Sequence, residues 1–240
     1  MKEYRNYIFD LYGTLIDIHT NESRKSFWEN FALLLKGHGI SYQPAELQKW
    51  YHRFCQAETE KRKEKSGKKQ VEIDIANVFT ALAGFKGVTL NEQDVIMIAR
   101  SFRIFSTDHI RLFPDVIDVL KTLRHNGRKI CLLSNAQKLF TEMEMESFDL
   151  KRYFDAIFYS SDHGIKKPDP CFLELLINEE KLDRQESVMI GNDYYDDIMP
   201  ACDSGLDSFY INSPQSRRFT DSLPFNCTRI SRLSDIIKLQ

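Results

Sequence analysis

Short apolar segments alternate with longer amphipathic ones along most of this chain, and this alternation restricts the possible fold more than any other feature. The apolar segments are rich in β-branched, aromatic or aliphatic side chains, as expected of short buried strands. They are Tyr7–Phe9, Lys129–Leu133, Ala156–Tyr159, Ser187–Ile190 and Ser208–Ile211. Strands that alternate with helices predict an α/β fold with a doubly wound, parallel, Rossmann-like sheet.

Two of the intervening segments carry recognisable helix signals. The segment Val116–Arg124 has helical spacing and precedes Asn126–Gly127, a pair that commonly ends a helix. The segment Cys171–Glu180 follows Asp169–Pro170. Aspartate is a favoured N-cap, and a proline at the first helical position loses no useful hydrogen bond. We therefore predict a helix over each segment.

One long interval, residues 17–110, departs from the alternation. Its apolar residues, such as Phe27 and Phe31, recur only at helical spacing. We expect this interval to contain helices only, inserted between the first and second strands of the sheet. The chain is thereby divided into a core of residues 1–16 and 111–240 and an all-helical insert of residues 17–110.

The composition excludes several classes of protein. The 240 residues carry a formal net charge of −2, which argues against a globally basic nucleic-acid binder and against an acidic disordered chain. No apolar run approaches the ~20 residues of a membrane span, and the first residues show no secretory signal. The five cysteines include no CxxC pair, which favours reduced thiols over disulfides or zinc. We expect a cytoplasmic monomer that binds neither nucleic acid nor membranes.

Four groups of chemically capable residues follow predicted strands or occupy loops. They are Asp10–Thr14, Ser134–Asn135, Lys166–Pro168 and Gly191–Asp197. Ligands bind beyond the carboxyl ends of the strands in an open parallel sheet, so Asp10 is a candidate nucleophile.

The last group is unusually acidic. Asp193, Asp196 and Asp197 lie within five residues and repel one another unless a cation or hydrogen bonds offset their charges. Oxygen-rich carboxylate sites of this kind suit magnesium.

In this order the four groups resemble the motifs of the haloacid dehalogenase-like (HAD) hydrolase superfamily, over essentially the whole chain. The resemblance implies that Asp10 is the nucleophile and that Ser134 holds the transferring group. It also implies that Lys167 pairs with the nucleophile, with Lys166 as the alternative bearer of that role. Thr14 and Asn135 are further candidate substrate contacts.

The position of the insert resembles the first cap type (C1) of the superfamily. Such a helical cap over the strand ends excludes water and contacts the leaving part of the substrate. Three of its basic residues, Arg24, Lys25 and Arg53, could contact an anionic small-molecule substrate.

The resemblance also implies a Mg²⁺ site formed by Asp10, the backbone carbonyl of Tyr12 and an acid of the last group. Asn192 occupies the usual place of that acid, which leaves two alignments open. In one, Asn192 is a neutral oxygen ligand and Asp197 lies behind it. In the other, Asp193 is the ligand, and we prefer this alignment because two anionic oxygens hold a hard dication more tightly than one.

Tyr12 stands where phosphatases of the superfamily mostly carry a second aspartate that acts as general acid and base. A phenol is a poor base at neutral pH, and general acid–base help is typically worth ~10²–10⁴-fold. The Asp-x-Tyr-Gly-Thr form resembles the 2-haloacid dehalogenases, in which halide leaves without a proton and no metal is used. Those enzymes carry a tyrosine where this chain has Leu173, and their last motif differs.

These observations predict a hydrolase, with a magnesium-dependent phosphatase as the leading hypothesis. Asp10 would attack a small phosphate monoester and form an aspartyl-phosphate that water then hydrolyses. A metal-independent 2-haloacid dehalogenase is one alternative. A binding protein on this fold with little turnover is the other, because a fold alone does not guarantee activity.

Overall fold

The computed structural model, which describes residues 2–238, contains a six-stranded sheet in the order β5-β4-β1-β6-β7-β8. Every neighbouring pair of strands in this sheet is parallel. The strands are β1 (Asn6–Phe9), β4 (Lys129–Ser134), β5 (Ala156–Tyr159), β6 (Ser187–Gly191), β7 (Asp207–Ile211) and β8 (Cys227–Ile230). The chain order reverses at β1, so the sheet is doubly wound as predicted.

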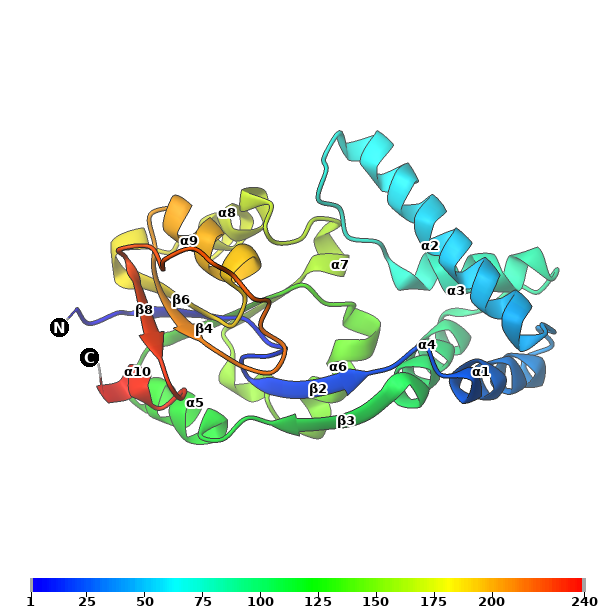
Figure 1. Cartoon of the computed structure of the whole chain (residues 1–240), viewed down its shortest axis with the longest axis horizontal. Coiled ribbons are helices and arrows are strands. Elements are labelled where there is room, and N and C mark those ends of the chain that lie inside the picture. Colours follow the sequence, from blue (N-terminus) through cyan, green and yellow to red (C-terminus); the bar gives the residue numbers. More distant parts are fainter. Residues whose placement is uncertain (1, 239–240) are drawn as a thin grey trace.

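Helices cover both faces of this sheet (Figure 1). In β1 the side chains of Tyr7 and Phe9 join one buried cluster, and that of Ile8 joins the other. This alternation is expected of a central parallel strand that is buried on both sides. The helices are α5 (Val116–His125), α6 (Lys138–Ser147), α7 (Ser160–His163), α8 (Pro170–Glu179), α9 (Met199–Asp203) and α10 (Asp235–Lys238).

The predicted helix signals are confirmed. Helix α5 ends at His125, next to Asn126, and Gly127 has a φ of 67°. Helix α8 begins at Pro170, and the Asp169 carboxylate accepts a hydrogen bond from the Cys171 backbone N–H at 2.9 Å.

Four further helices lie beyond one end of the sheet and form a separate unit (Figure 1). They are α1 (Lys25–Gly37), α2 (Pro44–Ser66), α3 (Ile75–Phe85) and α4 (Glu92–Ser106). Their apolar faces share one aromatic core, in which Phe102 lies with its ring centroid 5.0 Å from those of Phe27, Phe31 and Tyr51. Within residues 2–238, no helix is long and apolar enough to cross a membrane.

The expectation that residues 17–110 contain helices only is wrong at both ends of the interval. Strand β2 (Ile16–Thr20) and strand β3 (Thr107–Leu112) pair in antiparallel fashion and connect the helical unit to the sheet. Asp17 on β2 lies opposite Arg111 on β3, and their side chains form an ion pair at 2.7 Å. The physical reason is pairing between two segments about ninety residues apart, which helical periodicity does not reveal.

Strand β8 was also absent from the sequence-based prediction. It is a short edge strand whose Thr228 and Arg229 are exposed, so it lacks the apolar character of the other strands.

We expect truncation of Phe102 to destabilise the helical unit strongly. Phe102→Ala removes a ring that is 1% exposed and contacts aromatic side chains of three other helices, so it should cost about 3–5 kcal/mol of unfolding free energy. The control Leu33→Ala changes a side chain that is 70% exposed and should stay within about 0.5 kcal/mol. Denaturant unfolding measures both; equal stabilities would contradict the prediction.

Candidate active site

The carboxyl ends of the central strands bring the predicted polar groups to one edge of the sheet. Phe9 at the end of β1 lies between Leu132 of β4 and Ile190 of β6. The residues that follow these strands therefore meet where the strand order reverses, which is where open parallel sheets bind ligands. A pocket of about 150 Å³ lies there, lined by Asp10, Tyr12, Ser134, Asn135, Lys167, Asn192, Asp193, Asp196, Asp197 and Gln215.

The Lys167 ammonium is at the centre of this pocket. Its Nζ donates to Asp10 Oδ1 at 2.7 Å, to Asp197 Oδ1 at 2.6 Å and to the Leu133 carbonyl at 3.0 Å. Burial alone would lower the pKa of Lys167, but the carboxylates of Asp10 and Asp197 raise it above its ordinary value. Burial raises the pKa of Asp10, and the Lys167 ammonium opposes that shift. The lysine is therefore held charged between two buried acids.

The structure distinguishes between the two adjacent lysines. Asn135 accepts a hydrogen bond from the Lys167 backbone N–H at 2.8 Å and donates to the Lys167 carbonyl at 3.0 Å. These two bonds orient the loop so that Lys167, and not Lys166, reaches Asp10. Asn135 thus positions the lysine, in addition to lining the pocket.

Thr14 and Asn192 lie on the other side of Asp10. The Thr14 hydroxyl is 3.2 Å from Asp10 Oδ2 and 3.3 Å from Asn192 Oδ1, so these two oxygens face a common donor. Gly13, with a φ of 89°, leaves room for Asn192: a Cβ at position 13 would lie 2.4 Å from Asn192 Nδ2. The glycine is therefore needed both for the turn and for the close approach of the two loops.

The Asp193 side chain is fully engaged elsewhere. Its Oδ1 accepts from the backbone N–H groups of Tyr195 and Asp196, both at 2.9 Å, at the start of a π-helical turn (Tyr194–Ile198). Arg217 donates to both Asp193 oxygens at 2.5 Å, and it also pairs with Asp196 at 2.8 Å. Burial opposes the shift, but these hydrogen bonds lower the pKa of Asp193.

Sequence reasoning missed Arg217 and Gln215, which belong to the loop between β7 and β8. Gln215 donates to Asp17 Oδ1 at 2.6 Å, and Ser216 Oγ lies 3.4 Å from Asn192 Nδ2. Together with Arg217, these residues fold the loop over the acidic segment. No motif or spacing marks them in the sequence; an arginine beside a polar loop is ordinary on a protein surface.

Ser134 is buried at the end of β4, and its hydroxyl has no hydrogen-bond partner among residues 2–238. A buried hydroxyl without a partner is costly, so its retention calls for an explanation such as a catalytic role or a bound ion. This observation fits the predicted role of Ser134 in holding a substrate oxygen.

The hydroxyl of Tyr12 is bound by helix α6. It donates to the Glu144 carboxylate and lies 2.9 Å from Thr141 Oγ1. Arg103 of α4 donates to the same Glu144 at 2.5 Å and its guanidinium lies over the Tyr12 ring. Burial, and then the Glu144 carboxylate, raise the pKa of Tyr12 above its ordinary value. The phenol thus connects the core to the helical unit.

The basic residues predicted to contact a substrate from the insert lie outside the pocket. Arg24 pairs with Asp108 at 2.7 Å, Lys25 lies 3.4 Å from Glu29, and Arg53 stacks over Trp50.

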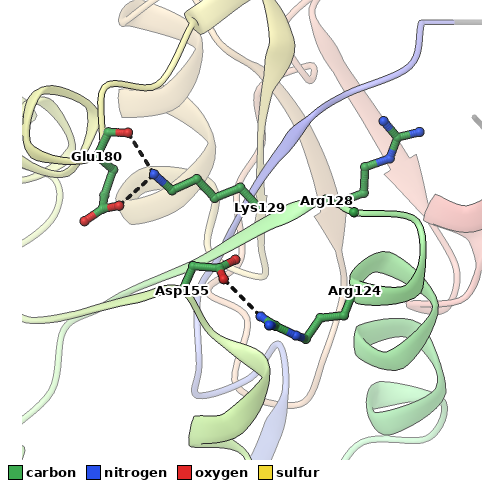
Figure 2. Close-up of a pocket in the computed structure, with 6 residues that line it drawn as sticks. Arg124, Arg128, Lys129, Asp155 and Glu180 are labelled. Carbon is green, nitrogen blue, oxygen red and sulfur yellow. Dashed lines mark hydrogen bonds and ion pairs between the residues drawn. The ribbon is translucent and has the colours of Figure 1, made fainter.

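A second hollow, of about 440 Å³, opens at the opposite edge of the sheet. Figure 2 shows that Lys129 there bonds to Glu180 and Arg124 bonds to Asp155. The hollow lies at the amino ends of the strands and contains none of the predicted site residues.

A family model described as haloacid dehalogenase-like hydrolase matches residues 4–203. The chain therefore belongs to the haloacid dehalogenase-like hydrolase family. A glyceraldehyde 3-phosphate phosphatase of Methanothermobacter thermautotrophicus is 24% identical over 131 residues, covering 55% of this chain and 58% of that protein. A phosphoglycolate phosphatase of Aliivibrio fischeri is 31% identical over 100 residues, covering 42% of this chain and 44% of that protein. The chain thus spans about half the length of these relatives.

Solved structures share the fold over nearly the whole chain. The putative HAD-hydrolase YfnB of Bacillus subtilis, solved with magnesium, has a TM-score of 0.58 at 20% identity and 99% coverage of both chains. A 2-haloacid dehalogenase of Pseudomonas syringae has a TM-score of 0.65 at 18% identity, with 98% of this chain and 97% of that chain covered. At these identities the likeness shows the fold, and the chemistry must be argued from the site.

We predict that Lys167→Met destabilises the protein by about 3–5 kcal/mol, because it leaves the buried carboxylates of Asp10 and Asp197 without a cation. Lys166→Met is the matched control and should change stability by less than about 0.5 kcal/mol. Denaturant unfolding curves of the two variants test this, and the idea fails if both lysines prove equally dispensable.

Proposed function

We propose that the protein is a magnesium-dependent phosphatase that uses Asp10 as its nucleophile. One observation carries the proposal: the Asp10 carboxylate and the Ser134 hydroxyl, which has no partner in the described part of the chain, line one small pocket with the Lys167 ammonium. A pocket of about 150 Å³ with these groups suits a compact oxyanion such as a phosphoryl group. The relatives named above as phosphatases support the same chemistry.

The roles of the residues follow from their contacts. An Asp10 oxygen attacks phosphorus, the bond from phosphorus to the leaving oxygen breaks, and an aspartyl-phosphate forms. Lys167, Thr14 and Ser134 offset charge on the phosphoryl oxygens. Water then attacks phosphorus, and the electron pair of the phosphorus–Asp10 bond returns to the carboxylate.

The residues present fit a Mg²⁺ ion, although only one of the candidate ligands is anionic. Within the described part of the chain, no three carboxylate, imidazole or thiolate side chains converge into a metal cage. The candidate donors are the Asp10 carboxylate, the Tyr12 carbonyl and Asn192 Oδ1, and oxygen donors of this kind suit magnesium. When bound, the ion would neutralise charge on the phosphoryl group.

The contacts of the acidic segment favour Asn192 over Asp193 as the metal ligand. Asn192 Oδ1 shares the Thr14 hydroxyl with Asp10, whereas both Asp193 oxygens accept hydrogen bonds from Arg217. Asp197 lies behind, held by Lys167. This arrangement reverses our preference from the sequence.

The two alternative functions differ from this proposal at particular residues. Leu173 is buried under the sheet and does not line the pocket, which weighs against a dehalogenase that uses a tyrosine there. A binding protein with little turnover remains the second candidate, because the Tyr12 phenol is occupied by Glu144.

The remaining expectations belong to this proposal as well. We place a cap function in the helical unit of residues 17–110, over a core of residues 1–16 and 111–240. The contact between Arg103 and Glu144 joins the two parts.

All five cysteines are free, which suits a reducing, cytoplasmic setting. The monomeric state stays a prediction.

We expect Asp10→Asn to abolish phosphate release from p-nitrophenyl phosphate, which the wild-type protein should hydrolyse with magnesium and not with chelator. The amide is isosteric but is a much weaker nucleophile than the carboxylate. Halide release from 2-chloropropionate that survives chelator would replace this function by dehalogenation. Absence of both activities, with retained Mg²⁺ binding, would support the binding protein.

We predict that Asn192→Asp tightens Mg²⁺ binding by roughly tenfold, equivalent to about 1.4 kcal/mol, because it adds an anionic ligand. Asp193→Asn should have a smaller effect, since Arg217 already holds that carboxylate. Titration calorimetry with Mg²⁺ compares the two variants without any substrate. Loss of binding in Asp193→Asn, with no gain in Asn192→Asp, would restore the Asp193 alignment.

A further inference from the structure

Within residues 2–238, each carboxyl, phenol and ammonium group that lines the pocket is already engaged by another protein group; the Ser134 hydroxyl is not, but an alcohol is too weak an acid to protonate a leaving group. The Tyr12 proton is donated to Glu144, and the three protons of Lys167 are donated to Asp10, Asp197 and Leu133. Among residues 2–238, the other acids that line the pocket are Asp193, Asp196 and Asp197, and each accepts from Arg217 or Lys167. Each of these carboxylates is therefore paired with a cation.

This lack of a donor affects substrates very unequally. An alkyl phosphate must expel an alkoxide, whose conjugate acid is about as weak as water, so the leaving oxygen needs a proton as its bond to phosphorus breaks. A carboxylate (pKa about 4) or a phosphate (second pKa about 6) leaves as a stable anion. Without a general acid, the hydrolysis of alkyl phosphates should therefore be slower by ~10²–10⁴-fold, whereas the hydrolysis of the anhydrides should be little affected.

A larger cavity adjoins the pocket and suits an anionic leaving group. It measures about 590 Å³ and shares Asn135, Lys167 and Asp196 with the pocket. Its further lining includes Gln70 and Glu72 from the helical insert, and Lys166, Tyr195 and Arg217 from the core.

The charges of this cavity favour an anion. Lys166 is half-buried and forms no ion pair within residues 2–238, so its ammonium can act on a ligand. The lining also holds two acids, Glu72 and Asp196. Both Glu72 oxygens are occupied, by Gln137 at 3.0 Å and by Ser160 at 2.9 Å, and Asp196 pairs with Arg217 at 2.8 Å. A free cation beside the reacting centre stabilises charge that develops on a leaving oxygen.

We infer that the substrate is an anhydride of phosphoric acid, either an acyl phosphate or a phosphoanhydride, and this inference rests on the proposed phosphatase function. Asp10 attacks phosphorus, and the electron pair of the broken bond leaves with the carboxylate or phosphate, which takes no proton. Water completes the second step, and its proton passes to solvent. Tyr12 serves as a positioning residue, tied to Glu144.

The test measures kcat/KM with magnesium for acetyl phosphate, inorganic pyrophosphate, a series of substituted phenyl phosphates and glycerol phosphate, each corrected for spontaneous hydrolysis. We expect kcat/KM to fall steeply as the leaving-group pKa rises, with an anhydride about 10²–10⁴-fold above glycerol phosphate. Acetyl phosphate and pyrophosphate distinguish the two kinds of anhydride. Tyr12→Asp should flatten the dependence by raising the rate with glycerol phosphate about 10²-fold.

The controls distinguish a failure of this substrate class from a failure of the proposed phosphatase function. Anhydride hydrolysis that persists in Asp10→Asn would remove the proposed function itself. Activity that needs Asp10 but is equal for glycerol phosphate and acetyl phosphate would overturn the substrate class alone. So would a selective loss of glycerol phosphate hydrolysis in Asp196→Asn, because it would identify Asp196 as the general acid. A thermal melt of each variant confirms folding.

Discussion

The buried ammonium of Lys167 is the interaction on which the rest of the site depends. Two carboxylates are buried here, that of Asp10 directly after β1 and that of Asp197 in the π-helical turn that follows β6. Like charges in that setting repel strongly and are costly to bury. One cation between them makes the arrangement stable and leaves Asp10 Oδ2 facing Thr14. The fold can therefore hold a buried carboxylate at the point where its strand order reverses.

Two more cations organise the surroundings of that pair. Arg217 crosses from the loop after β7 and neutralises Asp193 and Asp196, so most of the negative charge of the acidic segment is used inside the protein. Arg103 reaches from the helical unit to Glu144, which in turn holds the Tyr12 phenol. The site is thus rich in acids yet has few groups left for a metal or a leaving group. Its chemistry depends on the groups that remain uncommitted.

Much of the fold was predictable because burial leaves a strong periodic signal. The five apolar strands and the helices after Asp115 and Asp169 follow from it directly. The elements that were missed carry little apolar signal. Strand β2 is buried only at Ile16 and Asp17, β3 has no buried residue, and β8 is exposed at Thr228 and Arg229. Their pairing depends on partners far away in the chain, which local patterns do not encode.

The candidate site, like the fold, has features that the sequence predicts and features that only the tertiary structure decides. That Asp10, Ser134 and the acidic segment would share one edge follows from sequence, because parallel strands place their carboxyl ends together. Folding of distant segments onto one another settled the rest: which lysine pairs with Asp10, where the Tyr12 hydroxyl points, and whether Asp193 is free. Each outcome depends on a partner from another loop or helix, and electrostatic pairing acts through space and is independent of position along the chain.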